Sequence, residues 1–176
     1  RAALASAVCH CAGRPETPVQ VGAAIPLQGP ERQPDPYQRA ALSARWPHRT
    51  FARGNTAVAF LQEAIRAHPG EVTLLASGPL TNLALLFAQD AEIPTLLRGL
   101  TMVGGSFAAQ TAEEEWNILC DPHAAAQVLA APVPILSVGY DVTRHCRLDA
   151  ATCRAFLARA GRPLAFVAEM LEVFFR

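Results

Sequence analysis

The sequence predicts an α/β fold: an open, mostly parallel sheet with helices on both of its faces. Three observations predict it. Short apolar runs typical of strands alternate with longer segments of helical periodicity. Three of these runs end in turns that contain glycine. Hydrophobic residues make up 51% of the chain, which is enough for a packed core and too many for a disordered chain. Alternating strands and helices favour parallel pairing with right-handed crossovers.

The first third of the chain is the least regular part. A helix is predicted over residues 2–12, and a short alternating strand over 18–21. The stretch 25–50 is rich in proline, arginine and glutamine, and it is predicted as a long irregular loop. Loops of that length in a compact domain are usually functional or disordered. Asn55 then caps an amphipathic helix over residues 56–68.

From residue 72 onward, strands and helices alternate. A buried strand is predicted over 72–76, and further strands are predicted over 100–103 and 134–138. One helix is predicted to begin at Pro79, and a second covers 122–131. Two more helices, over 149–160 and 163–175, end the chain. The helix that begins at Pro79 is apolar on nearly its whole surface, so we expect it to be buried. No internal repeat is visible, and residues 1–176 are interpreted as a single domain.

Composition excludes several classes of protein. Fifteen arginines balance fifteen acidic residues, and this zero net charge argues against a nucleic-acid binder. No apolar run reaches the roughly 18 residues of a membrane-spanning helix, so no membrane partner is expected. Five irregularly spaced cysteines argue against a disulfide framework and favour a reducing, cytoplasmic compartment. Cys9-His10-Cys11 looks like part of a metal site, but ordinary buried or half-buried thiols are the favoured interpretation.

The chemistry is expected at the carboxyl ends of the strands, where open parallel sheets bind ligands. Three turns are predicted to meet there, at residues 77–79, 104–106 and 139–141. Their glycines allow backbone groups to come close to a ligand. Each turn also has a structural interpretation: Ser77 as a helix cap, the two glycines at 104–105 as a tight loop, and Asp141 as a cap or a loop brace, with a catalytic role as the alternative.

An acidic run, Glu113 to Glu115, and then Asn117 follow the second turn. On an extended segment, Glu115 and Asn117 point the same way because they are two residues apart. A carboxylate and an amide side by side can hold two neighbouring hydroxyls, which suggests a sugar ligand. The structural alternative is a solvated acidic run. A further alternative, an enzyme for phosphorylated sugars, lacks an arginine next to Gly104-Gly105.

Five blocks of sequence resemble the inosine-uridine preferring nucleoside hydrolases. They are Glu71–Asn82 (EVTLLASGPLTN), Val103–Gly105 (VGG), Glu115–Ile118 (EWNI), Cys120–Ala125 (CDPHAA) and Val138–Thr143 (VGYDVT). Their order and spacing fit the family over about Pro18 to Thr143. The resemblance implies a Rossmann-like sheet of which this chain is a central part, truncated at both ends.

The resemblance implies an N-glycosidase that hydrolyses the bond between ribose and a purine or pyrimidine base. In this family a bound Ca²⁺ grips two ribose hydroxyls and a water, on which an aspartate acts as general base. Matched by position, the backbone carbonyl of Ser77 is a Ca²⁺ ligand, Glu115 and Asn117 bind the ribose, and Val103 borders the sugar. The family usually has Thr, Phe and Met where this sequence has Ser77, Trp116 and Val103.

Two parts of the family pattern are missing from this sequence. There is no DxDxxxDD-like run, which supplies the general base and most calcium carboxylates in the family, and no late His-Asp pair. We therefore expect no catalytic residue within this chain, weak calcium binding and almost no activity from the 176 residues alone. For the full-length protein the resemblance implies a homo-oligomer. The alternative is a non-catalytic remnant that binds ribosides or serves as an interaction domain.

Overall fold

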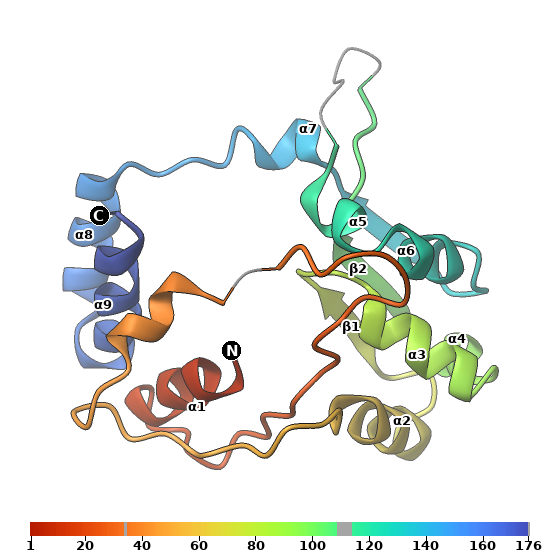
Figure 1. Ribbon diagram of the computed structural model, residues 1–176, viewed down its shortest axis with the longest axis horizontal. Helices are drawn as coiled ribbons and strands as arrows, with labels where there is room; N and C mark the ends of the chain where they lie inside the picture. Colours follow the sequence, from red (N-terminus) through yellow and green to blue (C-terminus); the bar gives the residue numbers. More distant parts are fainter. Residues whose placement is uncertain (34, 109–113, 176) are drawn as a thin grey trace. The chain divides into compact units, whose positions relative to one another are not determined.

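The computed structural model of the protein describes residues 1–33, 35–108 and 114–175 and contains two compact units (Figure 1). The sheet unit comprises Gly22–Gln33 and Gly54–Arg147, and the helical unit comprises Arg1–Val21, Pro34–Arg53 and Leu148–Arg176. Each unit has a hydrophobic cluster of its own, so each is described by itself. The single domain over residues 1–176 stays a prediction.

Within the described residues, three strands form one parallel sheet in the order β1 (Thr73–Ala76), β2 (Gly99–Val103) and β3 (Ile135–Val138). The register pairs Leu75 with Thr101 and Thr101 with Leu136. All three strands are predicted from the sequence, and their parallel pairing confirms the α/β class. Because the strands are parallel, their carboxyl ends meet at one edge of the sheet.

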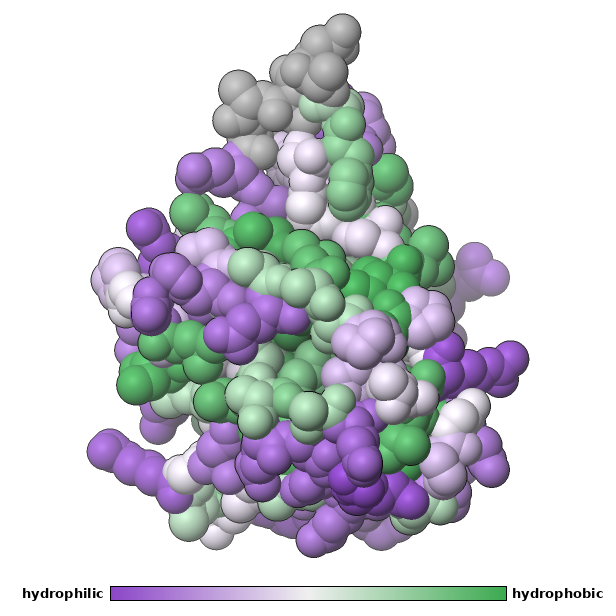
Figure 2. Space-filling model, turned by 90° about the vertical axis from the view of Figure 1, so that its right-hand side faces the viewer, coloured by the Kyte–Doolittle hydropathy of each residue, from purple (hydrophilic) through white to green (hydrophobic). Residues whose placement is uncertain are grey.

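One face of the sheet packs against helices (Figure 1). These are α2 (Ala57–Ala67), α3 (Thr81–Gln89), α4 (Ile93–Leu96) and α6 (Pro122–Leu129). Leu100 and Met102 of β2 are buried in the same hydrophobic cluster as Leu86 of α3 and Val128 of α6. The prediction that the helix after Pro79 is buried is confirmed. Figure 2 shows this side of the sheet unit, where hydrophilic residues are interspersed with hydrophobic ones.

The opposite face of the sheet is more exposed than the sequence predicts. The mostly apolar run 72–76 predicts a buried strand, but Leu75 is 73% exposed, and Leu136 of β3 is 64% exposed. Successive side chains of a strand point to opposite faces. Leu74 points to the helices and joins their cluster, so Leu75 points away from them. Leu75, Thr101 and Leu136 therefore form a row across the exposed face.

The helical unit is built from α1 (Ala2–Cys11), η1 (Tyr37–Ala41), α8 (Ala150–Ala160), η2 (Arg162–Leu164) and α9 (Ala165–Phe174). Phe166 of α9 is fully buried, and the centroids of the Phe166 and Trp46 rings lie 5.3 Å apart. The indole of Trp46 donates to Glu169 at 2.6 Å. The predicted helices of this unit are confirmed, and η1 forms inside the long predicted loop. Among the described residues, none of the helices combines the length and the hydrophobicity that crossing a membrane requires.

Short helices are the main departure from the predicted elements. α5 (Trp116–Cys120), α7 (Tyr140–Thr143) and α4 have only four or five residues, too few for a helical period to be visible. α3 begins at Thr81 rather than at Pro79. The strand predicted over residues 18–21 is wrong: these residues are described and are not part of a strand. Their alternation is short and starts at a proline, which cannot donate to a ladder.

Candidate functional site

The three predicted turns lie at the carboxyl edge of the sheet, each directly after a strand. Ala76 at the end of β1 pairs with Met102, and Val103 at the end of β2 pairs with Val138. The second and third turns are hydrogen-bonded to each other: the amide of Tyr140 donates to the carbonyl of Gly105 at 2.8 Å. The sequence prediction that these turns share one edge is confirmed.

Gly104 and Gly105 fit the turn after β2 for two different reasons. Gly105 has a φ of +85°, a left-handed conformation that glycine adopts at little cost. Gly104 is buried, and a Cβ there would lie 2.5 Å from the terminal methyl of Met102. Side chains at these positions would therefore strain the backbone or displace the core beneath the edge. The interpretation of the pair as a tight loop is confirmed.

Glu115 and Asn117 reach this edge on a helix and not on an extended segment. Glu115 is the N-cap of α5, and Asn117 lies in its first turn. The carboxylate of Glu115 accepts from the amides of Asn117 and Ile118, at 3.1 and 3.0 Å. The expectation that both residues lie on an extended segment is therefore wrong: Asn117 is helical, because the N-cap carboxylate of Glu115 satisfies backbone amides that a helix start leaves without partners.

A side-chain hydrogen bond nevertheless places Glu115 and Asn117 at the end of β2. The Nδ2 of Asn117 donates to the carbonyl of Val103 at 2.9 Å. One carboxylate oxygen of Glu115, Oε2, lies 3.7 Å from the position a Cβ would take on Gly104. Both side chains are at least nine-tenths buried. A buried carboxylate, a buried amide and Val103 thus come together at the second turn.

The remaining predicted residues take simpler positions. Ser77 is exposed and directly follows β1. It does not cap α3, whose N-cap position is Leu80 and carries no side-chain cap. Asp141, in the first turn of α7, accepts from the amide of Phe107 at 3.0 Å, so its interpretation as a brace is confirmed. Glu114 is exposed, while Glu113 lies outside the described residues.

The sequence predicts Asp121 as a helix cap, but its full burial and its long-range hydrogen bonds were missed. Asp121 is fully buried and caps α6 through the amide of Ala124, as its place before Pro122 predicts. It also accepts from the hydroxyl of Thr81 at 2.7 Å and from the amide of Leu27 at 2.8 Å. These distant partners give no local signal in the sequence.

Asn82, next to Thr81, makes a second link to the same N-terminal stretch. Its Oδ1 accepts from the amide of Ala23 at 2.8 Å and from the side chain of Asn55 at 3.3 Å. A Cβ on Gly22 would lie 2.5 Å from the side-chain nitrogen Nδ2 of Asn82, so the backbone of Gly22 lies close against the Asn82 side chain. Asn82 therefore binds one end of the stretch 22–27 directly, and Asp121, which Thr81 also contacts, binds the other end.

The most strongly paired ionisable groups lie at the other end of α3. Asp90, just after that helix, receives two hydrogen bonds from Arg66 and one from Gln62. These bonds lower the pKa of Asp90 to about 2, and they raise the pKa of Arg66 further above its ordinary range. Because α3 begins beside the carboxyl edge and ends at Asp90, this pair stabilises the fold away from the candidate site.

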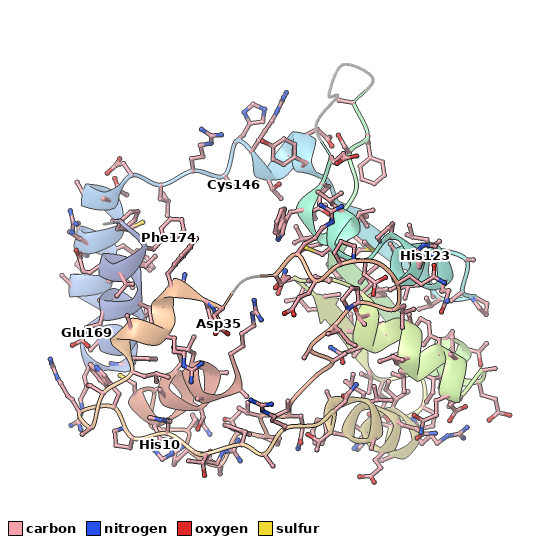
Figure 3. The ribbon with its side chains drawn as sticks, viewed as in Figure 1. His10, Asp35, His123, Cys146, Glu169 and Phe174 are labelled. Atoms are coloured by element: carbon pink, nitrogen blue, oxygen red, sulfur yellow. The ribbon has the colours of Figure 1, made fainter. Side chains whose placement is uncertain are left out.

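The donors of the described residues do not fit a Ca²⁺ ion by themselves. Calcium takes about six to eight oxygen ligands. No group of three or more His, Cys, Asp or Glu side chains that could hold a metal occurs in the described part of the chain. Figure 3 shows His10, His123 and Cys146 on separate elements. Cys9 and Cys11 are half-buried free thiols, as the sequence favours.

Comparison with known proteins gives the relatives of this chain. A family model described as inosine-uridine preferring nucleoside hydrolase matches residues 1–176. The pyrimidine-specific ribonucleoside hydrolase RihA of Salmonella enteritidis PT4 is 34% identical over 167 residues, which cover 92% of this chain and 53% of that protein. Uridine nucleosidase 1 of Arabidopsis thaliana is 34% identical over 150 residues, covering 81% and 44%. The chain thus spans about half the length of the curated relatives it matches.

Solved structures agree on the fold. A purine-preferring ribonucleoside hydrolase from Gardnerella vaginalis matches with a TM-score of 0.81 at 21% identity, covering 98% of this chain and 58% of that one. A plant nucleoside hydrolase matches with a TM-score of 0.66 at 25% identity, covering 81% and 48%. These matches, together with a family model that extends over every residue of the sequence, confirm the predicted resemblance. The chain belongs to the inosine-uridine preferring nucleoside hydrolase family.

Proposed function

We propose that this chain supplies the pentose-binding edge of a ribonucleoside hydrolase, which cleaves the bond between ribose and a purine or pyrimidine base. The observation that carries the proposal is the gathering of Glu115, Asn117 and Val103 at the carboxyl end of β2. Relatives named as ribonucleoside hydrolase and uridine nucleosidase support the reaction class. The substrate is a nucleoside.

Each residue of this group has a chemical task in the proposal. The carboxylate of Glu115 accepts one backbone amide at each oxygen, and a carboxylate oxygen has a second lone pair for a ribose hydroxyl. The amide of Asn117 is oriented by its bond to Val103, and its carbonyl oxygen can accept from a second hydroxyl. Burial strengthens such bonds because water competes less for them. The small side chain of Val103 leaves room for the sugar.

Hydrolysis also needs a base to take a proton from the attacking water. The carboxylates of Glu115 and Asp141 already accept backbone amides, and the sequence has no aspartate-rich run. We therefore propose that the general base and most Ca²⁺ ligands come from other parts of the whole protein. The carbonyl of Ser77 is the Ca²⁺ ligand proposed for this chain. The 176 residues alone are expected to be nearly inactive.

The test is hydrolysis by the full-length protein that the reading frame encodes. With inosine and uridine as substrates and calcium present, we expect free base and free ribose to appear in equal amounts. Chromatography of the base and a reducing-sugar assay measure both products. Release of neither product from any common ribonucleoside would contradict the proposal, and the same assay on the 176-residue chain checks its expected inactivity.

A second candidate is a protein that binds ribosides without cleaving them. The observation in its favour is that both carboxylate oxygens of Glu115 cap a helix, which is a structural task. Equilibrium dialysis with labelled uridine separates the two functions. Saturable retention of intact uridine by the full-length protein, with no base released, would favour the binding protein over the enzyme.

We also propose that the full-length protein is a cytoplasmic homo-oligomer. Five free cysteines are compatible with a reducing compartment. Light scattering coupled to size-exclusion chromatography measures the mass of the assembly, and fractionation of the native cells locates the protein. A monomer across a hundredfold range of concentration, or a protein found only outside the cytoplasm, would contradict this.

A further inference from the structure

Phe107 is a large apolar side chain that the fold holds at the surface of the carboxyl edge. It follows the turn after β2, and it is 66% exposed. Its position is fixed by its own backbone, because its amide donates to Oδ1 of Asp141 at 3.0 Å. Asp141 in turn belongs to α7, which follows β3. The residue that carries the ring thus follows β2 and is hydrogen-bonded to the helix that follows β3.

Two glycines make room for this ring. A Cβ on Gly139 would lie 2.7 Å from Cδ2 of Phe107, and a Cβ on Gly105 would lie 3.0 Å from its Cζ. Gly139 has an ordinary extended backbone, with a φ of −80°, so its conformation does not require glycine. What excludes a side chain at position 139 is the ring of Phe107 together with the carboxylate of Asp141. The backbone of both turns therefore lies against the ring.

The ring of Phe107 and the carboxylate of Glu115 approach two successive glycines of the same turn. Glu115 Oε2 is 3.7 Å from the Cβ position of Gly104, and the Phe107 ring is 3.0 Å from that of Gly105. A nucleoside has the same two parts side by side: a sugar with hydroxyls and a flat base. An exposed aromatic ring offers a stacking surface to any base, because every base has a π-face.

We propose that Phe107 is a base-binding residue that stacks on the nucleobase while Glu115 and Asn117 hold the ribose. This inference rests on the proposed function, because it assigns the base-binding side of the same site. Stacking accepts purines and pyrimidines alike. It acts on binding of the base and leaves the sugar contacts unchanged.

The experiment compares ligands with and without a base, using the full-length protein. Phe107→Leu removes the π-face and keeps a branched apolar side chain, whereas Phe107→Tyr keeps the ring. For Phe107→Leu we expect the KM of both uridine and inosine to rise about tenfold. The inhibition constant of free ribose, which has no base, is expected to stay within twofold of the wild-type value. Phe107→Tyr is expected to behave like the wild type.

Two further variants serve as comparisons. Phe156→Leu makes the same change on α8 of the helical unit, at a side chain that is 65% exposed, and it should leave both constants unchanged. Trp116→Leu removes the exposed ring at the start of α5, which is the competing stacking surface. Melting temperatures of all variants show whether each one is folded.

The outcomes distinguish this inference from the proposed function. If the wild type releases no base, the proposed function fails and the stacking role fails with it. If the wild type hydrolyses nucleosides and Phe107→Leu leaves their KM unchanged, only the stacking role is overturned. Equal weakening of ribose and nucleoside binding would also overturn it, because that pattern indicates a role in shaping the turn. A loss confined to Trp116→Leu would assign stacking to Trp116 instead.

Discussion

The side-chain amide of Asn117 donates a hydrogen bond to the backbone carbonyl of Val103, at 2.9 Å. This bond joins the first turn of α5 to the last residue of β2. It orients the amide and fixes the distance between the helix start and the sheet edge. In the proposed site this fixed amide meets a ribose hydroxyl, so its removal should affect binding and catalysis more than folding.

Asn117→Ala in the full-length protein tests that expectation. An unpaired polar group costs about 1–3 kcal/mol, so losing the contact to ribose should lower kcat/KM for uridine by about 10- to 100-fold. The free energy of unfolding should fall by only about 1 kcal/mol, the value of an ordinary hydrogen bond. Steady-state kinetics and urea titration measure the two effects.

Asn55→Ala is the matched control. The side-chain oxygen of Asn55 accepts from the amides of Ala57 and Val58 at the start of α2, so its loss also costs about 1 kcal/mol of stability. Activity should remain at the wild-type level because Asn55 has no part in the proposed site. Equal kinetic losses in both variants would remove Asn117 from the site.

Asp121→Ala should be the most destabilising change among the acidic residues of the sheet unit. It leaves the Thr81 hydroxyl and the amides of Leu27 and Ala124 without their acceptor in a fully buried place. With about 1 kcal/mol or more for each of these donors, we expect a loss of about 3 kcal/mol or more.

Urea unfolding followed by circular dichroism measures this loss. Asp149→Ala is the control, because Asp149 caps α8 through the amide of Thr152 but is exposed. Its removal should cost clearly less, since water replaces the lost acceptor. Similar midpoints for the two variants would show that the buried network around Asp121 contributes little.

The ion pair between Arg66 and Asp90 should make the free energy of unfolding depend on pH in the acidic range. Hydrogen bonds from Arg66 lower the pKa of Asp90 from 3.8 to about 2 in the folded protein. A carboxyl whose pKa is lower when folded stabilises the protein above its unfolded pKa, near 3.8. That contribution should decline as the pH falls from about 4 to about 2.

Urea midpoints measured between pH 2 and pH 7 check this dependence. Arg66→Gln removes the cation, so the pKa of Asp90 should return toward 3.8 and the variant should lose less stability across this range. Arg154→Gln, which removes the cation beside Glu172 on the exposed surface of the helical unit, is the control and should leave the acid dependence of Asp90 in place. Identical profiles for wild type and Arg66→Gln would refute the assignment.

Calcium should bind the 176-residue chain only weakly. The described residues present no cluster of three metal-binding side chains, and sites with few anionic oxygens bind Ca²⁺ at about 10⁻⁴–10⁻³ M. Isothermal titration with Ca²⁺ should therefore show no saturable heat at micromolar concentrations. Magnesium serves as the control for nonspecific binding to the acidic side chains. A micromolar Ca²⁺ site would contradict the expectation that the main ligands lie elsewhere in the whole protein.

The sheet unit illustrates which features a sequence can predict. β1, β2 and β3 are mostly apolar runs, each followed within two residues by a glycine, and the long helices between them have helical periodicity, so both kinds of element are predicted correctly. The shared edge of the three turns follows from parallel pairing alone. The short helix α5 has no such periodicity, and the orientation of Glu115 and Asn117 was therefore predicted wrongly.

Long-range contacts account for most of the structural features that the sequence does not predict. Asp121 was predicted as a cap because a cap is local, but its bonds to Thr81 and Leu27 depend on the whole fold. The exposure of Leu75 likewise depends on which face the helices cover, and a run of five residues of which four are apolar does not encode that choice. The position of Phe107 is not predictable from local sequence for the same reason, because its glycine neighbours Gly105 and Gly139 follow different strands.

The bond between the amide of Leu27 and Asp121 joins residues 94 positions apart in the chain. A ribosome synthesises residue 27 long before residue 121 leaves its exit tunnel, so this amide has no protein acceptor at Asp121 during most of translation. Residues 22–27 therefore cannot take their final place in the sheet unit until α6 has emerged. Slow synthesis between these two points would lengthen this delay, whereas rapid synthesis would shorten it.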